Sequence, residues 1–74
     1  IGKLKEAESS FRKAIELKPD SAHFHFWLGS VLKNLGNLKE AELSLRKAIK
    51  INPDFLNSYT TLGQVLHDRE ELLK

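Results

Sequence analysis

Apolar residues recur at intervals of three and four along most of this 74-residue chain. This spacing places them on one face of an α-helix, whereas a half-buried strand would alternate. Four series follow the rule: Leu4, Ala7, Phe11 and Ala14; Leu28, Val31, Leu32 and Leu35; Leu38, Ala41, Leu45 and Ala48; and Tyr59, Leu62, Val65 and Leu66. The pattern predicts four amphipathic helices, at about residues 3–17, 21–35, 38–51 and 55–70.

The residues between these series carry helix stop and start signals. A proline disfavours helical geometry in the residue before it, so helices should end near Lys18 and Asn52. Asp20 or Ser21 can cap the next helix. Gly36 suits a left-handed closing residue, and Asn37 with Glu40 resembles a capping box. Because no breaker follows Leu66, we expect the last helix to run on towards the C-terminus.

The sequence repeats itself with a period of about 34 residues, a length typical of stacked helical hairpins. The segment 2–8 returns as 36–42, 10–15 as 44–49, and 28–32 as 62–66. Gly29 and Gly63 interrupt predicted helices, where a glycine costs about 1 kcal/mol relative to alanine. Close packing against the following helix would compensate, so we expect both glycines at such contacts.

These residues resemble the tetratricopeptide-repeat family. The matching positions are Leu28, Gly29, Leu32, Gly36, Ala41, Leu45, Ala48 and Pro53, followed by Tyr59, Leu62, Gly63 and Leu66. His25 stands where the family has a bulky apolar residue. The resemblance implies an all-α fold, a fragment of an alpha-alpha superhelix with four antiparallel helices. Residues 1–20 would be the second helix of one repeat, 21–54 a complete repeat, and 55–74 the first helix of the next.

The family implies a function as a protein–protein interaction scaffold, with a peptide or partner protein bound on the concave face. The first helices of successive repeats line that face, and their inward positions alternate polar and aromatic side chains, which suits an extended ligand. The expected ligand-binding residues are His23, Phe26, Ser30 and Lys33, with Trp27 at the edge, and Asn57, Thr60, Gln64 and His67. Phe26 and Trp27 fit a core role equally, and the polar positions also fit a solvated surface.

Composition and charge narrow the functional classes. The chain has no cysteine and a net charge of +2, with basic and acidic residues interspersed. Lys33 is the only lysine or arginine on the expected inner stripes, so nucleic-acid binding is disfavoured, although an RNA-binding helical repeat is an alternative. A module that tethers or oligomerises a larger enzyme is another. No membrane segment is expected, and cytoplasmic location is the default.

Candidate chemistry is sparse. His23 and His25 lie two apart, on opposite sides of a helix, and cannot share a metal ion. No nucleophile elbow or phosphate-binding loop occurs. We therefore expect no enzyme activity, cofactor or metal. The chain opens on Ile1 without methionine, which indicates a longer parent chain with neighbouring repeats.

Overall fold

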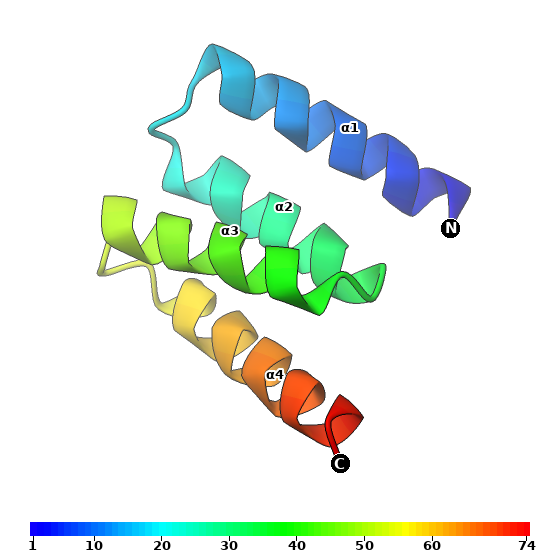
Figure 1. Ribbon diagram of the computed structural model, residues 1–74. Helices are drawn as coiled ribbons and strands as arrows, with labels where there is room; N and C mark the ends of the chain where they lie inside the picture. The colour runs from blue at the N-terminus through cyan, green and yellow to red at the C-terminus, as the bar shows by residue number, and fades with distance from the viewer.

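The computed structural model describes residues 1–74 as four helices joined by short turns (Figure 1). They are α1 (Gly2–Leu17), α2 (Ala22–Asn34), α3 (Leu38–Ile51) and α4 (Leu56–Leu72). Each helix runs antiparallel to the one before it. The all-α prediction is confirmed, and α4 runs on past the predicted end, as the missing breaker indicated.

The turn signals act largely as the sequence predicts. α1 and α3 end directly before Lys18 and Asn52, the residues that precede the two prolines. The Ser21 hydroxyl accepts a hydrogen bond of 3.3 Å from the backbone N–H of Phe24, which caps α2. Gly36 has a φ of 87°, a left-handed geometry that favours glycine.

The capping box predicted at the start of α3 is wrong. Asn37 is the N-cap residue, but its side chain makes no capping hydrogen bond. The carboxylate of Glu40 instead accepts a hydrogen bond of 2.7 Å from the Arg12 guanidinium of α1. The backbone N–H of Asn37, which Glu40 would accept in a capping box, donates instead to the carbonyl oxygen of Leu32 at 2.9 Å.

The hydrophobic core lies between α2, α3 and α4. Its buried members are Leu28, Leu32, Ala41, Leu45, Leu62 and Val65. α1 has no fully buried residue and contributes only half-buried side chains, Phe11 and Ile15 among them. The Cα atoms span 39 × 32 × 14 Å, so the fold is a slab.

The two helical glycines differ in their surroundings. A Cβ atom on Gly29 would lie 2.7 Å from Cγ of Leu45 and 3.3 Å from the carbonyl oxygen of Ala41. The predicted close contact of α2 with α3 is thus confirmed. A Cβ atom on Gly63 would meet nothing within 4 Å. The prediction for Gly63 concerned the helix after α4, and α4 is the last helix described, so that contact stays a prediction.

Equivalent polar contacts fix the start of α2 and of α4. Nε2 of His25 lies 2.9 Å from the carbonyl oxygen of Pro19, and the Tyr59 hydroxyl donates to that of Pro53 at 2.8 Å. Both contacts reach six residues back, so a histidine takes the place of a tyrosine in the repeat. The departure at His25 therefore keeps the local geometry.

One carboxylate, that of Glu42, joins α3 to α4 through two arginines. Glu42 accepts hydrogen bonds from Arg46 of its own helix and from Arg69 of α4. The bond from Arg46 is the main cause that holds the pKa of Glu42 below its ordinary value; the bond from Arg69 adds to it, and desolvation opposes it. Glu42 therefore stabilises the folded state at neutral pH, and this contribution is lost as the pH falls through the folded-state pKa.

We expect Glu42→Gln to lower the free energy of unfolding at pH 7, because the amide keeps the shape but loses the charge. The deficit should shrink between about pH 5 and pH 3, as the parent carboxylate becomes protonated. Urea unfolding at several pH values measures the difference in the free energy of unfolding between Glu42→Gln and the parent. Glu6→Gln is the control, since Glu6 is exposed and forms no ion pair. A deficit that is the same at pH 7 and pH 3 would contradict the assignment.

Candidate functional site

Four of the expected ligand-binding residues of α2, which are His23, Phe26, Ser30 and Lys33, share one face of the helix by their spacing. His23 is exposed, whereas Phe26, Ser30 and Lys33 are half-buried. Phe26 also packs against the hydrophobic core. It therefore has a structural role, with part of its ring left accessible.

The expected residues of α4 are more open. Asn57, Thr60, Gln64 and His67 are all exposed. The ammonium group of Lys33 donates a hydrogen bond of 2.7 Å to Oε1 of Gln64, which joins the stripe of α2 to that of α4. The two stripes thus form one continuous surface, which we call the α2–α4 face. Lys33 is already engaged by a neutral acceptor on this surface.

An aromatic cluster marks one end of the α2–α4 face. The Phe55 ring lies between His23 and Phe26, with centroid distances of 4.5 Å and 5.0 Å. Phe55 is the N-cap residue of α4 and is half-buried. Sequence reasoning missed it because the equivalent residue one period earlier is Ser21. An aromatic residue directly after Pro53 and Asp54 was the available signal.

Trp27 lies towards α1. Its ring centroid is 5.7 Å from that of Phe11 in α1 and 5.9 Å from that of Phe24. It also lies 5.7 Å from His23, which connects it to the aromatic cluster. Because 40% of its surface is exposed, Trp27 both covers the neighbouring helix and borders the α2–α4 face.

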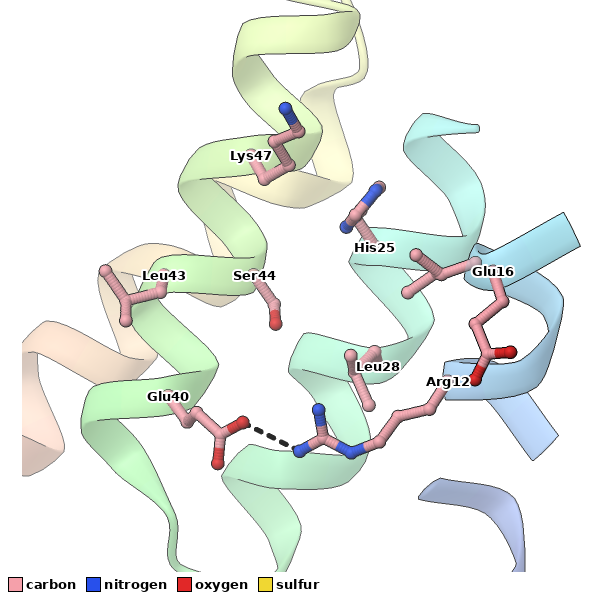
Figure 2. Close-up of a pocket in the computed structure, with 9 residues that line it drawn as sticks. Arg12, Glu16, His25, Leu28, Glu40, Leu43, Ser44 and Lys47 are labelled. Atoms are coloured by element: carbon pink, nitrogen blue, oxygen red, sulfur yellow. Dashed lines mark hydrogen bonds and ion pairs between the residues drawn. The ribbon is translucent and has the colours of Figure 1, made fainter. Parts of the chain in front are cut away.

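The largest cavity lies on the other side of α2, between α1 and α3 (Figure 2). It is an open groove of about 520 Å³, which we call the α1–α3 groove. Leu28 of α2 lines it, and the ion pair of Arg12 with Glu40 crosses it. Its other lining residues are Ile15, Glu16, His25, Leu43, Ser44 and Lys47. Sequence reasoning did not identify this groove, because its residues come from three helices.

None of the expected ligand-binding residues lines a cavity. The α2–α4 face is an open surface, which suits an extended peptide or a partner protein better than a small molecule. No cluster of three or more histidine, cysteine, aspartate or glutamate side chains has the arrangement needed to bind a metal. Two residues have shifted pKa values, and both belong to ion pairs. The hydrogen bond to Glu40 and next the one to Glu8 raise the pKa of Arg12. The hydrogen bond from Arg46 is the main cause that lowers the pKa of Glu42.

None of the four helices combines the length and apolar character that crossing a bilayer needs.

Two family models match the sequence, and both describe a tetratricopeptide repeat. The first matches residues 22–55 and the second matches residues 1–36, so together they cover residues 1–55. Neither describes a catalytic domain. No curated protein matches the chain.

Proposed function

Because this chain belongs to the tetratricopeptide-repeat family, whose repeats generally mediate protein binding, we propose that it binds a peptide or partner protein on the α2–α4 face. The observation that carries the proposal is the hydrogen bond between Lys33 and Gln64, since it makes one surface of two helices. Exposed polar side chains run along α4 beside it. Such a surface can hydrogen-bond a ligand backbone along its length.

The aromatic cluster supplies the apolar part of this proposed site. The Phe55 ring packs in tilted geometry against both His23 and Phe26, so these three rings offer apolar surface on which a ligand side chain can lose water. Aromatic pairs add about 0.5–1.5 kcal/mol beyond the area they bury. We therefore propose that the ligand carries an aromatic or aliphatic anchor at this end, next to backbone that pairs with the polar stripe.

The charge of the α2–α4 face limits its ligands. Lys33 is its only lysine or arginine, and its ammonium group already donates to Gln64. A carboxylate bound there would exchange water mainly for neutral donors, worth about 0.5–1.5 kcal/mol net, against 1.5–3 for charged ones. A ligand that depends on paired C-terminal acids is disfavoured on these grounds.

Selection of peptides from a random display library tests the proposal. We expect the selected peptides to carry an apolar anchor, and their affinity to survive amidation of the C-terminus. Thr60→Arg should weaken binding at least about tenfold, equivalent to 1.4 kcal/mol, by filling the middle of the α4 stripe. Calorimetric titration of each protein with a selected peptide measures this change in affinity.

Ser9→Arg is the matched control, because Ser9 is exposed on α1 and outside the α2–α4 face. It should bind like the parent. Equal weakening by the two arginines, or loss of binding when the peptide is amidated, would contradict the proposed site or its charge preference. Circular dichroism confirms that both variants keep their helices.

A further inference from the structure

The α1–α3 groove is a second concave surface of the molecule. Three consecutive helices form it, with α1 and α3 as its walls and α2 between them (Figure 2). Its volume of about 520 Å³ lies within the range of about 300–1,000 Å³ that is usual for ligand sites. None of its lining residues belongs to the α2–α4 face. The groove can therefore hold a ligand without displacing one from that face.

The middle of the groove is apolar. Leu28 of α2 lines its base and is otherwise buried, and Ile15 of α1 is half-buried on one wall. Leu43 of α3 lines the opposite wall and keeps 59% of its surface exposed. An aliphatic side chain placed among these three residues would remove apolar surface from water on both sides, which is favourable in proportion to the area covered.

The unpaired charge of the groove is positive. The Arg12 guanidinium donates a hydrogen bond of 2.7 Å to Glu40, so these two charges offset each other. Glu16, on the wall formed by α1, lies 3.8 Å from the ammonium nitrogen of Lys13. Lys47, on the wall formed by α3, is exposed and forms no ion pair. The acids of the groove therefore have basic partners, whereas Lys47 lacks an acidic one.

The repeat explains why Lys47 is unpaired. In α1, Lys13 and Glu16 lie three residues apart and form an ion pair. The same two positions one period later are Lys47 and Lys50, so a second lysine stands where the acid was. The other residues three or four positions from Lys47 are uncharged: Leu43, Ser44 and Ile51. A carboxylate supplied by a ligand would take the place beside Lys47 that Glu16 has beside Lys13.

The charged and apolar parts of the groove follow one another along its length. In Figure 2, Lys47 and His25 lie at one end, and the ion pair of Arg12 with Glu40 crosses the other. Ser44 lies between these ends on α3 and also lines the groove. Its hydroxyl can donate to the same carboxylate as Lys47, since the two residues are three positions apart on one helix face.

We propose that the α1–α3 groove is a second docking site, for a segment of a partner protein that carries an acidic side chain close to an aliphatic one. The carboxylate binds Lys47 and the Ser44 hydroxyl, and the aliphatic side chain packs on Leu28. This preference for an acid is opposite to that of the α2–α4 face. The proposal is independent of the role of that face, because the two surfaces share no residue.

Selection from a random peptide library tests the proposal, with peptides that also bind the Lys47→Glu variant removed. We expect the remaining peptides to carry an aspartate or glutamate close to a leucine, isoleucine or valine. Lys47→Gln should weaken the binding of a selected peptide about tenfold, because a neutral donor replaces a charged one. Leu43→Ser should also weaken it, by removing part of the apolar wall. Calorimetric titration measures the affinity of each variant.

Lys3→Gln is the matched control, because Lys3 is exposed on α1, outside the groove and without an ion pair. It should bind the selected peptide like the parent, and so should Thr60→Arg, which alters only the α2–α4 face. Circular dichroism checks that every variant keeps its helices. The proposal is overturned if no peptide is enriched, if the enriched peptides lack an acidic residue, if Lys47→Gln and Lys3→Gln have equal effects, or if Thr60→Arg abolishes binding.

Discussion

Gly29→Leu is expected to lower the free energy of unfolding by about 1–3 kcal/mol. Even the first atom of the new side chain would lie 2.7 Å from Leu45 Cγ. Leu45 is fully buried, and the backbone carbonyl of Ala41 closes the other side at 3.3 Å, so neither neighbour can yield cheaply. A core of this size supplies only about 3–5 kcal/mol, so a large part of the stability would be lost.

Urea unfolding compares Gly29→Leu with Ser30→Ala, a half-buried neighbour without such a contact. Ser30→Ala should change the stability much less. Equal unfolding free energies for Gly29→Leu and Ser30→Ala would show that α2 and α3 do not meet at Gly29.

Leu45→Ala alone is expected to cost about 2–5 kcal/mol, because it opens a cavity in the middle of the core. Leu45 is fully buried, with 0% of its surface accessible, and belongs to the core cluster between α2, α3 and α4. With so small a fold, the variant should have lost most of its helical circular dichroism at room temperature. Leu43→Ala is the control on the same helix, since Leu43 is 59% exposed. Similar stability for the two variants would contradict the assigned register of α3.

The sequence was sufficient to predict the four helices and their order because every turn between two helices carries a local signal. Pro19, Gly36 and Pro53 stop helices by backbone geometry alone, which needs no tertiary information. The capping box failed because the backbone N–H of Asn37 donates to the carbonyl oxygen of Leu32, while Glu40 pairs with Arg12, a residue of another helix. Local patterns cannot reveal such competition.

The candidate site was less predictable. The repeat indicates which positions of α2 and α4 share a face, but not that Lys33 would bind Gln64 across it. Phe55 was missed because it has no aromatic equivalent one period earlier. Gly63 resembles Gly29 in sequence yet lacks its contact, because a repeat pattern describes a position and not the presence of its neighbour.

The most direct test of the proposed function is a nuclear magnetic resonance titration of the isotope-labelled chain with a selected peptide. Our account predicts that the largest amide shifts occur on the α2–α4 face, at His23, Thr60 and Gln64. Shifts confined to the α1–α3 groove, around Arg12 and Lys47, would contradict it.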